Sequence, residues 1–412
     1  MGGRRSLATN PSTNDEATPL GLETDRPDDF VTRLQPLCQR AADSLRQLGW
    51  RVVFAESCTA GLVSAALGSI PGISEHLCGS AVTYRNQTKQ DWLGVSQEPL
   101  VNPGPVSQQV VQLMAQGVLN STAEANVALA VTGHLGPDAP SQLDGLIHLG
   151  VAGKEQPADD AASDFTATRV CRLESSQRLL RQQEAAHEVL ATLIDVMDIF
   201  DHRKRIREGE LEKSRFSWDH HFLREQPVSQ DDATTTPEFL FPGSFDPRHE
   251  GHLEIAQYVK STFGADVEYE LSLENVDKPA LEFSETLDRL FQFIGGNPIW
   301  LTQSATFEEK SRLFPEATFV VGADTMVRVA DPKYYQDEQS HRQAIATIVA
   351  AGCRFLVFGR QLDGDGLTTA GFYQLEDLIL PVELKEICRQ VPAAAFRADI
   401  SSTDLRARPE EK

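Results

Sequence analysis

The chain has 412 residues, enough for two or three domains at about 150 residues each. Its composition, 41% hydrophobic and 24% charged, is typical of globular domains with sizeable cores. The formal net charge of −22 repels nucleic acid and anionic membranes, so we expect neither as a partner. The cysteines are scattered and form no CxxC pair, and no apolar stretch is long enough to span a bilayer. We therefore expect a cytoplasmic protein with no zinc site and no disulfide framework.

Residues 1–30 are rich in Ser, Thr, Asn, Asp and Pro, a composition typical of a disordered leader. The start MGGRRS fits the short N-myristoylation pattern, but we interpret it as part of this leader.

Residues 31–200 alternate between helical and strand patterns, which predicts an α/β domain. Helices are expected at 37–49 and 176–200, and strands at 51–55, 79–84, 127–133 and 145–153. Residues 153–164 are expected to form a loop. The segment 201–236 is dense in charge and then polar, so we expect a linker that contains a short exposed helix.

Residues 237–412 begin a second α/β pattern, with strands expected at 238–243, 267–273, 317–323 and 354–360. The predicted fold class is thus α/β, with two α/β domains in one chain.

The first candidate site is the stretch ESCTAGL (56–62), where a strand passes into a helix. Ser57 or Thr59 could simply cap that helix. Alternatively, Ser57 is a nucleophile activated by a neutral lysine, and the helix N-terminus stabilises the forming oxyanion. The segment GSAVTYRNQTK (79–89) supplies Tyr84 and Lys89 after the next strand.

These segments resemble the CinA C-terminal domain family, the nicotinamide-mononucleotide deamidases, over roughly residues 34–200. The resemblance rests on ESCTAG, YRNQTK, GPVS and TGHLGP. It implies Ser57 as nucleophile, Lys89 as base and Tyr84 as proton relay. Further substrate contacts are implied for Thr59, Asn86, Thr132 and Gly133.

The chain departs from the family pattern around the expected pocket. Ala60 replaces a glycine, His134 and Leu135 replace small residues, and Asp138 interrupts a glycine run. The family's Gly-Asp-Arg reads Ser176-Gln177-Arg178, which keeps only the arginine. The nucleophile, tyrosine and lysine are present, so we expect the domain to be active, but the altered pocket wall defines its substrate less well than its activity.

The second candidate site is GSFDPRHEGH (243–252), supported by VVGADT (320–325) and ISSTDLR (400–406). His249 and His252, at a helix N-terminus, can donate hydrogen bonds to phosphate oxygens. The three segments resemble the HxGH nucleotidyltransferase superfamily with its Rossmann-like fold, which includes the nicotinate- and nicotinamide-mononucleotide adenylyltransferases.

That resemblance implies catalytic roles for both histidines and an ATP site. Asp324 would contact the adenosine, and Lys278 would contact a phosphate of the acceptor. The remaining ATP contacts are implied for Gly243, Ser244, Phe245, Ser402, Thr403 and Arg406. Mg²⁺ is expected to enter with the triphosphate, since no ligand cluster in the sequence indicates a metal site.

The sequence therefore favours a bifunctional enzyme of pyridine-nucleotide (NAD) metabolism, with ATP and nicotinamide or nicotinate mononucleotide as substrates. One alternative is adenylyl or cytidylyl transfer to another acceptor, such as a phosphopantetheine. A second alternative is a nucleotide sensor in which one domain binds without turnover. The oligomeric state stays open, a homo-oligomer included.

Overall fold

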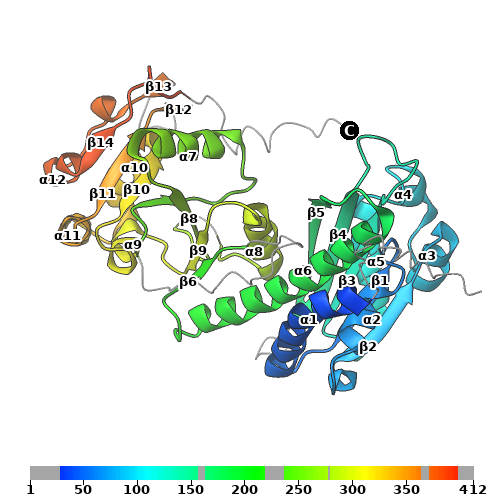
Figure 1. The fold of residues 1–412 in the computed structure, drawn as a ribbon. Helices are drawn as coiled ribbons and strands as arrows, with labels where there is room; N and C mark the ends of the chain where they lie inside the picture. Colours follow the sequence, from blue (N-terminus) through cyan, green and yellow to red (C-terminus); the bar gives the residue numbers. More distant parts are fainter. Residues whose placement is uncertain (1–27, 156–162, 219–235, 277–278, 363–370, 398–412) are drawn as a thin grey trace, which may run out of the picture.

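The computed structural model describes residues 28–155, 163–218, 236–276, 279–362 and 371–397. It contains two α/β domains, as the sequence predicts, and each is built on a mixed sheet. Figure 1 shows them as two lobes joined by a long helix. The expected leader lies outside the described residues except for 28–30, which begin the first helix.

The first domain alternates helices and strands. Its elements are α1 (Asp28–Leu48), β1 (Val52–Glu56), α2 (Leu62–Gly68), η1 (Ile73–Glu75), β2 (Leu77–Val82), α3 (Asn86–Leu93), α4 (Gln97–Val101), α5 (Gln108–Asn120), β3 (Val127–Gly133), β4 (Leu146–Glu155), β5 (Ser163–Arg172) and α6 (Arg178–Arg207).

The first sheet has the order β2-β1-β3-β4-β5. Strands β2, β1 and β3 run parallel, whereas β4 and β5 are antiparallel additions. The carboxyl ends of β1 and β2 therefore meet at one edge, where ligands bind in open α/β sheets. The sequence prediction missed β5, because polar and apolar residues alternate along β5, which follows the segment 153–164 that was predicted to be a loop. The two ends of that predicted loop belong to β4 and β5.

The second domain begins at β6, earlier in the chain than residue 237, where the sequence prediction placed its start. Its elements are β6 (Lys213–Phe216), β7 (Phe239–Pro242), α7 (Glu250–Phe263), β8 (Val267–Ser272), α8 (Phe283–Leu290), η2 (Phe291–Phe293), β9 (Ile299–Thr302), α9 (Phe307–Leu313), β10 (Thr318–Gly322), α10 (Ala323–Ala330), η3 (Pro332–Tyr334), α11 (Glu338–Ala350), β11 (Arg354–Phe358), β12 (Arg360–Leu362), β13 (Gly371–Tyr373), η4 (Leu375–Asp377), α12 (Val382–Glu386) and β14 (Cys388–Gln390).

The second sheet has the order β14-β11-β10-β7-β8-β9-β6 and is parallel except for β6. Strand β6 pairs antiparallel with β9, although it lies in the segment predicted as a linker. That prediction is wrong for two parts of 201–236, because residues 201–207 continue α6 and residues 213–216 belong to the sheet.

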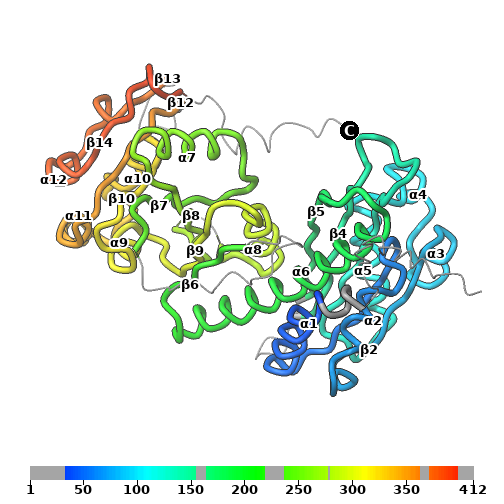
Figure 2. The backbone as a smooth tube through the Cα atoms, in the orientation of Figure 1, coloured from blue at the N-terminus to red at the C-terminus, as the bar shows by residue number. Residues whose placement is uncertain are grey.

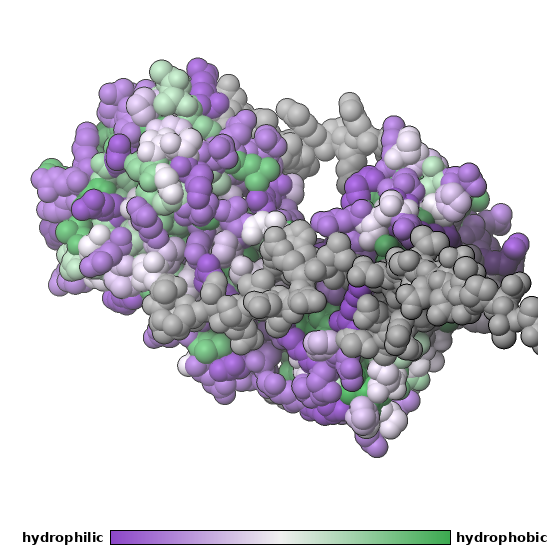
Figure 3. Space-filling model, in the orientation of Figure 1, coloured by the Kyte–Doolittle hydropathy of each residue, from purple (hydrophilic) through white to green (hydrophobic). Residues whose placement is uncertain are grey.

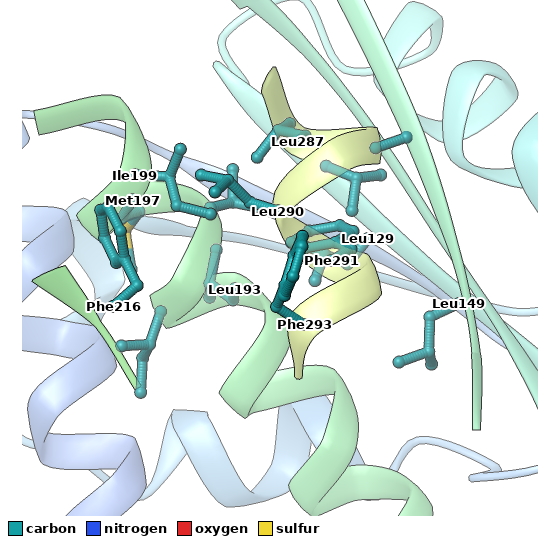
Figure 4. Packing of buried hydrophobic residues seen from close by; sticks show 14 of the residues in the cluster. Leu129, Leu149, Leu193, Met197, Ile199, Phe216, Leu287, Leu290, Phe291 and Phe293 are labelled. Carbon is teal, nitrogen blue, oxygen red and sulfur yellow. The ribbon is translucent and has the colours of Figure 1, made fainter. Parts of the chain in front are cut away.

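Helix α6 connects the two domains physically. It has 30 residues, which corresponds to about 45 Å at 1.5 Å per residue, and Figure 2 shows it running from the first lobe to β6 beneath the second. Buried side chains of α6, α8 and η2 belong to one hydrophobic cluster with β3 and β4 (Figure 4). The ring of Phe283 on α8 lies 4.7 Å from Phe165 on β5 and 5.5 Å from Phe200 on α6. The core is therefore continuous across the domain boundary.

The visible face of the molecule is mostly hydrophilic, with hydrophobic residues scattered among polar ones (Figure 3). Among the described helices, none combines the length and apolar character that crossing a membrane requires.

Candidate active sites

The turn that carries Ser57 is built around the carboxylate of Glu56, the last residue of β1. Glu56 is 1% exposed. Its two oxygens accept six hydrogen bonds of 2.8–3.1 Å, from the Thr59, Ser64 and Ser80 hydroxyls and from the backbone N–H groups of residues 61, 63 and 64. A buried carboxylate is tolerated where such donors replace water. Glu56 thus fixes the conformation of the turn.

This arrangement corrects two expectations about the start of α2. The residue at the helix boundary is Gly61, in a left-handed conformation with φ 96°, and neither Ser57 nor Thr59 caps the helix. The N-terminal N–H groups of α2 already donate to Glu56, so they are not the oxyanion donors that we expected. Thr59 donates its own hydroxyl to Glu56 and does not line the cavity described below.

Ser57 and Lys89 come together although 32 residues separate them. The Lys89 Nζ lies 3.0 Å from the Ser57 Oγ and donates to the Thr83 carbonyl oxygen at 3.1 Å. Lys89 is 2% exposed, and this burial lowers the pKa of its amine. Burial raises the pKa of the neighbouring Cys58 thiol to about 12, which keeps the thiol protonated. Ser57 is therefore the nucleophile that this geometry favours.

A cavity of about 260 Å³ opens above this pair. Its wall includes the other residues predicted from sequence, Tyr84, Asn86, Thr132 and Gly133. The Tyr84 hydroxyl accepts a hydrogen bond of 2.6 Å from Arg178, at the start of α6. The Thr132 hydroxyl donates to the Pro105 carbonyl oxygen at 2.9 Å. A Cβ on Gly133 would come within 2.5 Å of the Ile147 side chain, so this glycine is required for strand packing.

Arg178 also lines this cavity, although the sequence prediction left it without a role. A second hollow, of about 490 Å³, is also lined by Arg178 and shares the loop of residues 135–139 with the first. Arg181, one turn later, holds this loop region through paired bonds of 2.7 and 2.8 Å to Asp144. The only signal in the sequence was that Arg178 is retained from the family's Gly-Asp-Arg segment.

The second site lies where β7 passes into α7. The intervening loop carries Phe245, whose φ of 45° is left-handed, and a cis bond between Asp246 and Pro247. Gln292 of η2 holds this loop, accepting from the Arg248 N–H at 2.7 Å and donating to the Phe245 carbonyl at 3.0 Å. The loop therefore presents the two histidines from a fixed backbone.

His249 and His252 lie against each other, with ring centroids 3.8 Å apart. The His252 Nδ1 accepts from the His249 backbone N–H at 3.1 Å, which leaves the Nε2 as the protonated nitrogen of the neutral ring. Burial lowers the pKa of His252 to about 3, helped by the charges of His249, Arg360 and Arg248. His252 is thus a neutral donor at physiological pH.

The other residues predicted for this site differ in where they lie: some belong to the core, one is in an ion pair, and some fall outside the described residues. The Phe245 side chain is a core residue that packs edge-on against Phe241, Tyr269 and Phe293. A Cβ on Gly243 would lie 2.6 Å from that ring, so only glycine fits there, and Ser244 is half-buried. Asp324, near the start of α10, pairs with Arg328 at 3.2 Å. Outside the described residues lie Lys278, Ser402, Thr403 and Arg406.

Comparisons with known proteins match these two parts of the chain separately. Residues 34–197 match the model of the CinA C-terminal domain, and residues 240–408 match that of the cytidylyltransferase-like family. A nicotinamide-nucleotide amidohydrolase, PncC of Enterobacter agglomerans, is 41% identical over 139 residues, or 33% of this chain and 84% of that protein. A CinA-like protein of Syntrophobacter fumaroxidans is 48% identical over 95 residues, or 23% of this chain and 22% of that protein.

The chain thus spans most of the amidohydrolase but less than a quarter of that CinA-like relative. Among solved structures, the competence/damage inducible protein CihA from Agrobacterium tumefaciens is 33% identical, with a TM-score of 0.36, over 40% of this chain and 94% of that one. The family models and the amidohydrolase alignment agree with the segments that carry both candidate sites. The chain belongs to the CinA C-terminal domain family, and a cytidylyltransferase-like domain follows that domain in the same chain.

Proposed function

We propose that the first domain hydrolyses the carboxamide of nicotinamide mononucleotide and that the second transfers an adenylyl group from ATP to a pyridine mononucleotide. The observation that carries the proposal is the buried contact of 3.0 Å between Lys89 Nζ and Ser57 Oγ at the floor of a cavity. A serine needs a neighbouring base to act as a nucleophile. The similarity to a nicotinamide-nucleotide amidohydrolase supports an amide as the substrate.

In the proposed first half-reaction, neutral Lys89 accepts the proton of Ser57 as the Oγ attacks the carboxamide carbon. The tetrahedral intermediate collapses, the C–N bond breaks, and ammonia leaves after it takes up a proton from Lys89. Water then attacks the acyl-enzyme with Lys89 as base, the bond between the acyl carbon and Oγ breaks as Lys89 returns that proton to Ser57, and the acid product leaves and loses its own proton to solvent. The low pKa that burial gives Lys89 favours this cycle, because the amine must start without its proton.

Arg178 supports a substrate that carries a phosphate. Arg178 lines both hollows, and its guanidinium bonds the Tyr84 hydroxyl. A guanidinium suits phosphate because its donors form a fixed fork. We therefore assign the pyridine ring of the substrate to the cavity above Ser57 and its phosphate to the side of Arg178, with Tyr84 between them.

For the second domain, the histidine pair supports transfer at a phosphorus atom. The mononucleotide phosphate attacks the α-phosphorus of ATP and pyrophosphate leaves, so the protein needs donors and cations rather than a nucleophile of its own. The neutral His252 offers one donor from the start of α7. No cluster of three His, Cys, Asp or Glu side chains suited to a metal occurs within the described ranges. Magnesium is therefore proposed to arrive bound to the phosphates of ATP.

The two proposed reactions can follow one another. Deamidation of nicotinamide mononucleotide yields the nicotinate form, which is itself a mononucleotide acceptor. We propose that the second domain accepts the acid at least as well as the amide, since a charge-assisted hydrogen bond to a carboxylate is about twice as strong as a neutral one. Steady-state kinetics of the full-length Ser57→Ala chain, which should leave the amide intact, with each acceptor test this order. A strong preference for the amide would make the two activities parallel rather than sequential.

The test of the whole proposal is product analysis. The full chain is incubated with nicotinamide mononucleotide alone, and ammonia is measured for the wild type and for Ser57→Ala. A panel of ATP and CTP, each with several acceptors, then identifies the reaction of the second domain. Transfer from CTP alone would favour the cytidylyl alternative. Nucleotide binding without any product would instead support a sensor.

A further inference from the structure

Arg360 lies at the same end of the second sheet as the histidine pair. It begins β12 directly after β11, at the carboxyl edge of the parallel strands, where open α/β sheets bind their ligands. A Cβ built on Gly322 would lie 3.0 Å from the Arg360 Cγ and 3.3 Å from its Nε. The arginine therefore crosses the turn between β10 and α10, close to Asp324.

The charge of Arg360 also reaches both histidines. Besides burial, it is one cause of the lowered pKa of His249 and of His252. Both ring nitrogens of His249 are buried and have no hydrogen-bond partner. Buried polar atoms without partners are rare in folded proteins. A cation close to an unsatisfied imidazole is the arrangement that an anionic group would complete.

Arg360 also forms a long salt bridge with Asp324. The Arg360 Nε lies 3.7 Å from the Asp324 Oδ1, and these side chains are 25% and 36% exposed. Asp324 already has a closer partner in Arg328, at 3.2 Å. A partly exposed pair at such a distance contributes little to stability, so we interpret the carboxylate as a restraint on the position of the arginine.

We propose that Arg360 binds a phosphate of the nucleoside triphosphate in the second site, together with the His249 ring. This assignment rests on the proposed function of the second domain and adds a residue that neither HxGH nor ISSTDLR contains. The restraint by Asp324 holds the guanidinium near the site before the nucleotide arrives. Arg360 is a contact of the phosphate, whereas Asp324 positions it.

Calorimetric titration of the full chain tests this proposal with three probes: magnesium–ATP, inorganic tripolyphosphate and adenosine. We expect Arg360→Ala to weaken binding of ATP and of tripolyphosphate about 10- to 100-fold, as for the loss of a charge-assisted hydrogen bond. Adenosine binding should not change. Arg360→Lys should recover part of the loss, since lysine keeps the charge but not the fork. The matched control is Arg328→Ala, which removes the other partner of Asp324 and should change the affinity about 2-fold or less.

Wild-type affinity for ATP in Arg360→Ala would overturn the assignment. An equal loss of adenosine binding would also overturn it, because Arg360 would then act through Asp324. A wild-type chain that binds no ATP would contradict the proposed function of the second domain, and tripolyphosphate binding would still test Arg360. Melting curves of all variants exclude a loss of folding.

Discussion

Replacing Glu56 with glutamine changes the carboxylate that organises the nucleophile turn into an amide of the same shape. One carboxylate oxygen accepts from Thr59 and from the N–H groups of residues 61 and 63; the other accepts from both Ser64 donors and from Ser80. The amide NH₂ should take the second position, because the Ser64 and Ser80 hydroxyls can turn to accept from it. Only the Ser64 backbone N–H then loses its acceptor.

The expected cost follows from this count. One buried donor without a partner costs about 1–3 kcal/mol, and the charge-assisted character of the other bonds is also lost. We expect Glu56→Gln to destabilise the first domain by about 2–4 kcal/mol, which lowers the melting temperature by roughly 4–16 °C for a domain of this size. Since the turn positions Ser57, a displacement of 1 Å would reduce deamidation about 100-fold.

Differential scanning calorimetry and an ammonia-release assay measure both effects. The matched control is Glu124→Gln, at a carboxylate that is 66% exposed and 3.9 Å from its partner Arg51; its melting temperature should stay within about 1–2 °C of wild type. If Glu56→Gln had the same melting temperature as the control and kept full activity, the carboxylate would not organise the turn.

Three further predictions concern the two candidate sites and a buried ion pair of the second domain. Ser57→Ala should abolish ammonia release, and the wild-type rate should rise with pH as Lys89 loses its proton, at a pH below the ordinary lysine range because burial lowers its pKa; a flat pH–rate profile would exclude Lys89 as base. The low pKa of His252, about 3 against an ordinary 6.5, means that the unfolded chain binds the proton more readily, so stability falls as the pH drops below about 6.5. Urea unfolding at pH 7 and pH 5 should therefore show a smaller loss for His252→Gln than for wild type, and equal losses would refute this. In the wild type, Lys310 donates at 2.7 Å to the carboxylate of Glu270, which is 1% exposed. Lys310→Met leaves this carboxylate buried without its cation, which should lower the free energy of unfolding in urea by about 3–5 kcal/mol; an unchanged midpoint would contradict this prediction.

The sequence predicted the parts of the fold that local patterns specify. Strands β1 and β2 and the turns after them were expected, and because parallel neighbours end at one edge, Ser57 and Lys89 meet there. Four buried strands of the second domain, β7, β8, β10 and β11, were identified in the same way, together with the histidine pair at the start of α7, whereas the buried β9 was missed.

The remaining features depend on contacts between distant segments. Strand β6 pairs with β9, about 85 residues later in the chain, and a four-residue charged segment carries no local signal of that pairing. The bond between Arg178 and Tyr84 spans 94 residues. The role of Glu56 depends on donors from α2 and β2 that gather only when the sheet forms. These are the features that the sequence prediction missed or misassigned.

The central claim, that one chain carries an amidohydrolase and an adenylyltransferase, is tested most directly by mass spectrometry in ¹⁸O-labelled water. The full chain is incubated with nicotinamide mononucleotide, ATP and Mg²⁺. We predict nicotinate mononucleotide carrying one ¹⁸O, followed by a dinucleotide that contains it. Ser57→Ala should prevent the labelled acid from forming, and Arg360→Ala should reduce dinucleotide formation without affecting the acid. Recovery of unlabelled nicotinamide mononucleotide and intact ATP from the wild-type reaction would contradict the claim.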